Sequence, residues 1–133
     1  MSVVLFSDQA CQLRVKYWFT GPGQTHYTCW LVPRGAQPGH AGKPFIDEPA
    51  TQAPVSKLLP NPAAANDGAT LKVKVSCDGD VNDEQALHFD IYEIHADTTS
   101  SRIGGFEESL TVKIKGNAVD NCCDRYYFLR RSK

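Results

Sequence analysis

The sequence predicts an all-β fold in which two antiparallel sheets pack against each other as a sandwich. Several segments alternate between apolar and polar residues with the period of a strand, and no segment shows a convincing helical stripe. Clusters of glycine, proline, asparagine and aspartate separate these segments, as turns between strands require. The length of 133 residues suits one domain, so we expect a single sandwich domain over residues 1–133.

Four segments alternate most clearly, at residues 11–19, 71–77, 87–91 and 110–114. In the first segment, Leu13, Val15 and Tyr17 alternate with polar or amphipathic neighbours. Such a strand buries one face and leaves the other in water. We therefore expect a core built from Leu13, Val15, Tyr17, Leu71, Val73, Val75, Leu87, Phe89, Ile91, Leu110, Val112 and Ile114.

Three further segments are weaker strand candidates. Residues 3–6 and 26–32 are apolar in both phases, and residues 125–130 are rich in aromatic side chains. Turn residues predict chain breaks at residues 20–23, 77–84, 103–106 and 116–117. The total of about seven to eight antiparallel strands is that of a small sandwich of immunoglobulin-like character.

Residues 35–68 interrupt the strand pattern. They hold six of the eight prolines, four glycines and seven alanines, so half of this segment is Pro, Gly or Ala. We expect one long irregular loop that is held to the sheet by Phe45, Ile46, Val55, Leu58 and Leu59. Long structureless loops are uncommon in compact domains and often carry function. The segment is therefore either an ordered crossover between the sheets or an arm that binds a partner or ligand.

The formal net charge of −1 conceals an uneven distribution along the chain. Residues 78–108 carry nine acidic side chains and one basic one, whereas residues 110–133 carry six basic and two acidic ones. We expect these stretches to form neighbouring strands whose charges neutralise each other across the sheet. The near-neutral total argues against nonspecific binding to nucleic acid, and no apolar run has the length of a membrane span.

Enzyme signatures are absent from the sequence. It contains no nucleophile elbow, no phosphate-binding loop and no zinc-hydrolase spacing. His88 shares a strand face with Asp90, as Glu93 does with His95, and we expect ordinary surface pairs rather than a catalytic centre. The five cysteines include no CxxC pair, so we expect plain thiols or simple core disulfides. The sequence thus favours a non-enzymatic protein without a cofactor.

One acidic turn has the spacing of oxygen ligands. Asp78, Asp80, Asn82 and Glu84 occupy every second position, as in the first half of a calcium loop. The pattern of an EF-hand fails further on, because Phe89 stands where its last ligand belongs. A solvated turn is the simpler interpretation, and a weak calcium site is the alternative.

Candidate binding residues lie on the outward phase of the segment 11–19 and in the long loop. Gln12, Arg14, Lys16 and Trp18 form that outward phase, which we expect to join Lys72, Lys74, Lys113 and Lys115 in one basic face. An aromatic side chain on such a face anchors a protein interface or stacks on a sugar. The predicted binding residues are Arg14, Lys16, Trp18, Phe45, Leu58 and Leu59.

The second half of the chain resembles a known class of modules. It reads Phe-Asp-Ile-Tyr-Glu at 89–93 and Leu-Thr-Val-Lys-Ile-Lys-Gly at 110–116, with an Asp-rich turn before the first of these strands. These motifs are similar to those of immunoglobulin-like modules attached to bacterial type VI secretion spike proteins and their effectors. The resemblance covers about half of the chain, residues 67–118. It implies an immunoglobulin-like sandwich and a place in a bacterial secretion or injection apparatus.

These observations predict a non-enzymatic protein-binding or adaptor module whose partner is another protein or a second copy of the chain. The alternative is a lectin-like module that binds carbohydrate, with calcium at the turn of residues 78–84. Residues 1–6 lack the basic region and the apolar length of a signal peptide, which predicts synthesis in the cytoplasm and leaves signal-independent export open.

Overall fold

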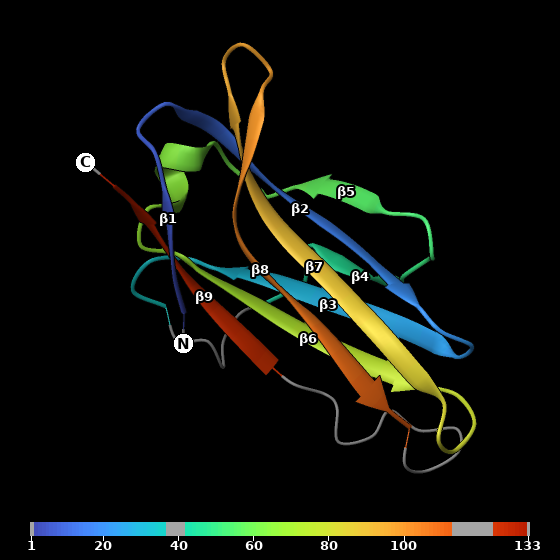
Figure 1. Cartoon of the computed structure of the whole chain (residues 1–133). Coiled ribbons are helices and arrows are strands. Elements are labelled where there is room, and N and C mark those ends of the chain that lie inside the picture. Colours follow the sequence, from blue (N-terminus) through green and yellow to red (C-terminus); the bar gives the residue numbers. More distant parts are fainter. Residues whose placement is uncertain (1, 37–41, 113–123, 133) are drawn as a thin grey trace.

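The computed structural model describes residues 2–36, 42–112 and 124–132, which form two stacked β-sheets. One sheet has five strands in the order β1-β9-β6-β3-β4, and the other has four in the order β5-β2-β7-β8 (Figure 1). All neighbouring strands are antiparallel except β1 and β9, which run parallel. The strands are β1 (Ser2–Phe6), β2 (Ala10–Thr20), β3 (Gln24–Val32), β4 (Ile46–Pro49), β5 (Val55–Leu58), β6 (Thr70–Asp78), β7 (Glu84–His95), β8 (Ser100–Thr111) and β9 (Asp124–Arg131).

The prediction of an all-β protein with two packed sheets is confirmed. The finer prediction, that the sandwich has an immunoglobulin-like topology, is not confirmed. In an immunoglobulin domain the last two strands are neighbours in one sheet. Here β8 belongs to the four-stranded sheet and β9 to the five-stranded sheet. The two strands face each other across the sandwich, where Arg125 of β9 pairs with Glu108 of β8.

The core lies between the two sheets, where the inward phases of their strands meet. Nine of the predicted core residues, from Leu13 to Ile91, are at most 2% exposed. Val112 is also buried, Leu110 is partly buried against the core, and Ile114 lies outside the described residues. Four of the largest fully buried side chains lie outside this predicted set and come from the weaker strand candidates and the long loop: Phe6, Tyr27, Ile46 and Leu129.

The segment predicted as one irregular loop contains regular structure. It forms β4, β5 and the short 3-10 helix η2 (Ala63–Asn66). Each strand adds to the edge of a different sheet, β4 to β3 and β5 to β2. Apolar residues hold the segment in place, because Ile46 and Leu59 are 2% exposed and Leu59 N–H donates to the Leu13 carbonyl at 2.9 Å. The segment is thus a crossover that closes one edge of each sheet.

The predicted chain break at residues 103–106 is wrong, because β8 runs through it without interruption. Its register against β7 shifts next to Ile103, so this residue forms a bulge. Gly105 follows the bulge with a φ of +133°, and a Cβ there would lie 2.1 Å from the Phe89 carbonyl oxygen. The two glycines therefore permit a bulge and a close approach inside a strand, rather than ending one. Of the predicted strand 110–114, Leu110 and Thr111 form the end of β8, Val112 follows it, and residues 113–114 lie outside the described residues.

The prediction that the acidic stretch 78–108 and the basic stretch 110–133 form neighbouring strands of one sheet and neutralise each other's charges is also wrong. The acidic strands β7 and β8 lie in the four-stranded sheet, and the basic strand β9 lies in the five-stranded sheet. Asp90 instead pairs with Arg102 of β8, with Nε 2.8 Å from Oδ1. An ion pair between Arg125 and Glu108 links β9 to β8 across the two sheets. The charge pattern along the sequence is therefore divided between two layers.

Within the described part of the chain, no helix has the length and apolar character needed to cross a membrane.

Candidate binding surfaces

Four of the predicted binding residues lie together on the outer face of the four-stranded sheet. Arg14, Lys16 and Trp18 point outward from β2, because the alternating residues of this strand are buried. Leu58 of β5 stands directly opposite Arg14 and is 54% exposed. This grouping follows from the antiparallel pairing of β2 and β5, which places opposite residues on the same side of the sheet.

The side chains of this face contact each other across β2 and β7. The Trp18 ring stacks on His88, with centroids 4.6 Å apart and an interplanar angle of 5°. Lys16 Nζ lies 5.7 Å from the centroid of the Trp18 ring, and the Arg14 guanidinium lies 5.3 Å from that of Tyr92. One face of the Trp18 ring is thus covered by its own sheet, which reduces the aromatic surface that a sugar or partner can reach.

The basic face expected from eight residues does not form as one surface. Lys72 and Lys74 belong to β6, in the five-stranded sheet, so they face the opposite side of the sandwich from Lys16. Lys113 and Lys115 lie outside the described residues. The alternation of each strand identified its outward side chains, but it carried no information about which strands share a sheet.

Two predicted binding residues of the long loop lie elsewhere. Leu59 is 2% exposed and packs in the core, so its side chain is not presented to a partner. Phe45 is half-buried and lines a pocket at the end of the sandwich.

The turn proposed as a calcium alternative is closed by hydrogen bonds of its own. The Asp83 carboxylate accepts from the Asp80 N–H at 2.9 Å, and Asn82 N–H donates to the Val112 carbonyl at 2.8 Å. Among the residues that the structure describes, no group of three or more His, Cys, Asp or Glu side chains is placed to hold a metal ion. The calcium site therefore stays a prediction.

The edge strand β1 was not selected as a binding element from the sequence. Val3 and Leu5 point outward from it and are 61% and 56% exposed, more than any other large hydrophobic side chain in the described ranges. On its inner side Val4 and Phe6 enter the core. In the described part of the chain β1 pairs with β9 alone, so the hydrogen-bonding groups of its other edge have no strand partner.

The composition of β1 distinguishes it from the other three sheet edges. The edge strand β4 contains Asp47, Glu48 and Pro49, and β5 contains Lys57. The fourth edge strand, β8, carries one arginine, two glutamates and the bulge. Charges, prolines and bulges protect edge strands from pairing with other chains, whereas residues 2–6 contain none of these devices.

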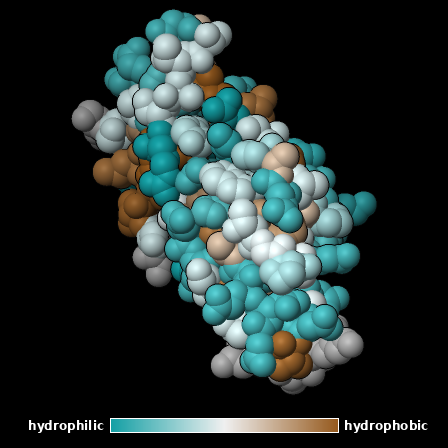
Figure 2. Space-filling view, turned by 45° about the vertical axis from the view of Figure 1, so that its right-hand side comes forward, coloured by the Kyte–Doolittle hydropathy of each residue, from teal (hydrophilic) through white to brown (hydrophobic). Residues whose placement is uncertain are grey.

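The outer face next to β1 is aromatic and basic. Lys72 lies between two aromatic rings, with Nζ 4.9 Å from the Trp30 centroid and 5.8 Å from that of Tyr126. On β9, Phe128 stands beside Val3, and the Arg130 guanidinium lies 5.6 Å from the Phe128 centroid. Figure 2 shows another view of the molecule, in which hydrophilic atoms cover most of the surface and hydrophobic atoms appear in small groups.

The carboxylate of Glu93 organises a polar cluster where β1, β2 and the β7–β8 hairpin meet. Its side chain accepts hydrogen bonds from Ser7 Oγ at 2.6 Å and from Ser7 N–H at 3.1 Å, and it bonds His95 Nε2 at 2.6 Å. In a Ser-His-Asp catalytic triad the histidine lies between the other two groups. Here the Glu93 carboxylate lies between Ser7 and His95, so the cluster does not have the arrangement of a triad. Burial raises the pKa of Glu93, but the hydrogen bonds from Ser7 and His95 outweigh burial and hold it below its usual value.

This cluster predicts a pH dependence of stability. Because the pKa of Glu93 is lower in the folded than in the unfolded chain, its contribution is complete above the ordinary value of 4.5 and is lost as the pH falls below it. We expect Glu93→Gln to lower the free energy of unfolding by about 2 kcal/mol at neutral pH and to flatten the acid limb of its pH profile. Urea denaturation across this pH range measures both effects. Glu107→Gln is the matched control, because that side chain is 77% exposed; an equal loss in both variants contradicts the assignment.

Three of the five cysteines lie in the described ranges. Cys11 is exposed, whereas Cys29 and Cys77 are buried. Burial raises the pKa of the Cys29 thiol, which keeps it in the unreactive protonated form. Cys122 and Cys123 lie outside the described residues. The Cys29 side chain thus acts as a small apolar group in the core.

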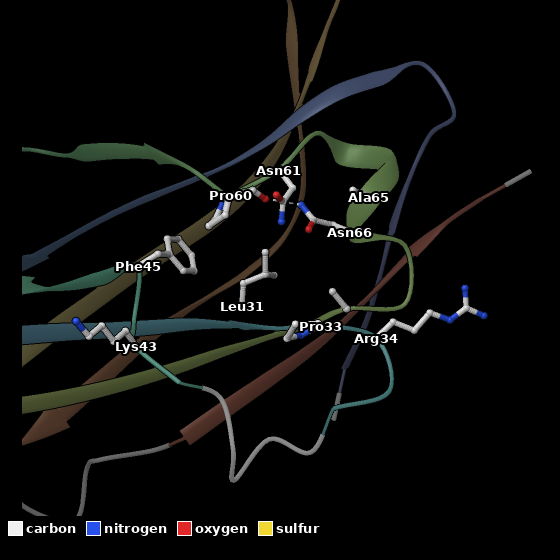
Figure 3. Close-up of a pocket in the computed structure, with 10 residues that line it drawn as sticks. Leu31, Pro33, Arg34, Lys43, Phe45, Pro60, Asn61, Ala65 and Asn66 are labelled. Atoms are coloured by element: carbon white, nitrogen blue, oxygen red, sulfur yellow. Dashed lines mark hydrogen bonds between the residues drawn. The ribbon is translucent and has the colours of Figure 1, made fainter.

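A pocket of about 170 Å³ opens at the end of the sandwich, between the long loop and the end of β3 (Figure 3). Leu31 and Phe45 form its apolar side, and the amides of Asn61 and Asn66 lie close together on the opposite wall. Arg34 and Lys43 flank the opening, with their charged ends directed away from each other. Six of its ten lining residues come from the segment 35–68, so this segment builds the pocket.

Comparisons of the chain with protein-family models, with curated proteins and with solved structures find no match.

Proposed function

We propose that this protein is a non-enzymatic binding module that takes an extended segment of another protein along the free edge of β1. The observation that carries the proposal is the contrast between β1 and the other edge strands of the described residues: among these edges, β1 alone is uncharged, without proline, and exposes two large apolar side chains. An added strand gains main-chain hydrogen bonds along such an edge, and pockets for alternate side chains supply specificity.

The face beside β1 supports a protein partner. Tyrosine, tryptophan and arginine are enriched at the centres of protein interfaces. Here Tyr126, Trp30 and Arg130 lie on the outer face of the same sheet, together with the exposed side chains Val3 and Leu5. Positive charge on Lys72 favours a partner segment that carries acidic residues next to apolar ones.

The context of this binding is proposed from the sequence resemblance alone. The strands at 89–93 and 110–116 are similar to those of immunoglobulin-like modules of bacterial type VI secretion spike and effector proteins. We propose on that basis that the chain serves as an adaptor in a secretion or injection apparatus. An immunoglobulin-like relationship of the fold is part of the same hypothesis.

A double substitution at the edge tests the proposed function. Val3→Lys with Leu5→Lys places two charges on the exposed side of β1, where lysine blocks strand addition. We expect this variant to capture at least about tenfold less of the specific partner from native lysate than the wild-type protein does. Because both side chains are exposed, the free energy of unfolding should change by less than about 0.5 kcal/mol.

Leu58→Lys is the matched control, since Leu58 is an equally exposed leucine on the edge strand of the other sheet. It should leave capture unchanged. Hydrogen exchange should show that the backbone amides of β1 become protected when the partner binds. Equal loss of partner in both variants, or unchanged capture by the β1 variant, contradicts the proposal.

The alternative function is carbohydrate binding, for which Trp18 on the outer face of the four-stranded sheet is the candidate side chain for stacking on a sugar. A glycan array probed with and without calcium distinguishes it. Binding that Trp18→Ala abolishes, and that the Val3 and Leu5 substitutions leave intact, would favour the alternative.

A further inference from the structure

The pocket between the long loop and β3 has the size of a small ring. Its volume is about 170 Å³. An apolar cavity of about 150 Å³ in another protein is large enough to bind benzene. Leu31 and Phe45 supply the apolar surface against which such a ring packs (Figure 3). The space therefore admits one six-membered ring and leaves its substituents at the opening.

The Asn66 side chain places an open polar atom in the pocket wall. The side chain of Asn66 is buried, with 1% of its surface exposed. Its Nδ2 donates to the Pro60 carbonyl at 3.1 Å, and this bond sets the orientation of the amide. The other amide atom, Oδ1, accepts no hydrogen bond from the described residues. This oxygen is therefore open to a hydrogen bond from a ligand in the pocket that can donate one.

The charged residues around the opening favour one sign of charge on the ligand. Arg34 and Lys43 flank the pocket, and no carboxylate is among the residues that line it in the described ranges. Both cations have long flexible side chains that can turn toward a bound group. A negatively charged substituent at the opening is thus favoured over a positive one.

We propose that this pocket binds a single six-membered ring that carries a hydrogen-bond donor, as a phenol does. The ring packs between Leu31 and Phe45, and its hydroxyl donates to Asn66 Oδ1. A phenol reaches the protein either as a free small molecule, where a carboxylate on the ring meets Arg34 and Lys43, or as the tyrosine side chain of a partner. This site is independent of the proposed function at β1, which lies at the opposite edge of the five-stranded sheet from the β3–β4 side.

Titrations followed by NMR of the backbone amides test the site with defined probes. We expect 4-hydroxybenzoate to give saturable shifts at Leu31, Phe45 and Asn66, with an affinity at least about tenfold higher than that of 4-methoxybenzoate, which cannot donate. N-acetyl-tyrosine amide distinguishes the two sources. Tighter binding of the free acid indicates a small molecule, and tighter binding of the tyrosine derivative indicates a partner side chain.

Two neighbouring alanines provide a variant and its control. Ala65 lines the pocket and Ala64 does not, yet both side chains are exposed, so neither substitution disturbs the core. Ala65→Phe should fill the opening and abolish the shifts, whereas Ala64→Phe should preserve them. Asn66→Ala should remove the preference for the hydroxyl, with the fold checked by thermal denaturation. No saturable shifts with any probe, no preference for the hydroxyl, or shifts that persist in Ala65→Phe would overturn the proposal.

Discussion

Replacing Gly105 with alanine is expected to lower the free energy of unfolding by about 3 kcal/mol or more. Two independent costs contribute. The φ of +133° is a backbone conformation that residues with a side chain rarely adopt, and the new Cβ would lie 2.1 Å from the Phe89 carbonyl oxygen. The atom in the way belongs to the backbone of β7, so relief requires the β7–β8 pair to separate locally.

Gly35→Ala separates these two costs. Gly35 also has a positive φ, of +86°, but an added Cβ there meets nothing within 4 Å. We expect this control to lose only the backbone contribution, about 1 kcal/mol. Urea denaturation measures both variants, and hydrogen exchange at β7 and β8 reports the local opening. If the two substitutions destabilise the protein equally, the close approach at Gly105 is not the cause.

Truncation of Phe89 to alanine is expected to cost about 4 kcal/mol of stability. Phe89 is fully buried at the centre of an aromatic cluster that joins the sheets. Its ring lies 5.5 Å from Phe106 and 6.5 Å from Tyr17 in its own sheet, measured between centroids. Across the core it lies 6.0 Å from Tyr27 and 6.4 Å from Tyr127. Removing it leaves a cavity that four other rings border, and large rings do not collapse easily into such a space.

Two comparison variants test this explanation. Phe89→Leu keeps most of the volume and should cost less than about half as much as Phe89→Ala. Leu58→Ala removes an exposed side chain and should change stability by less than about 0.5 kcal/mol. Chemical denaturation at low temperature provides the measurement for all three. A loss below about 2 kcal/mol for Phe89→Ala would show that the cluster repacks around the vacancy.

Much of the strand content could be predicted from the sequence, because alternation is a local property. The inward residues of β2, β6 and β7 were selected correctly since one face of each strand is wet. Local reasoning failed at Gly104 and Gly105, where a bulge inside a strand has the same composition as a turn. It also failed at β4 and β5, because short edge strands in a proline-rich segment owe their structure to the sheets they join.

The candidate surfaces were predicted less well. Arg14, Lys16 and Trp18 share a face because they belong to one strand, and Leu58 joins them through pairing that the sequence did not reveal. The unprotected edge of β1 is visible in its composition, but only the strand order shows that β1 is an edge. The pocket depends on residues from Leu31 to Ala69, and no motif connects them.

The sequence by itself determined that this protein is built from β-strands and which side of most strands is buried. Both properties follow from the period of two between side chains on one strand, which needs no knowledge of any other strand. The tertiary structure decided which strands are neighbours, which edges stay open and where the long loop encloses a pocket. These depend on pairings between distant segments, whose stability comes from the packing of the whole core rather than from any short stretch of residues.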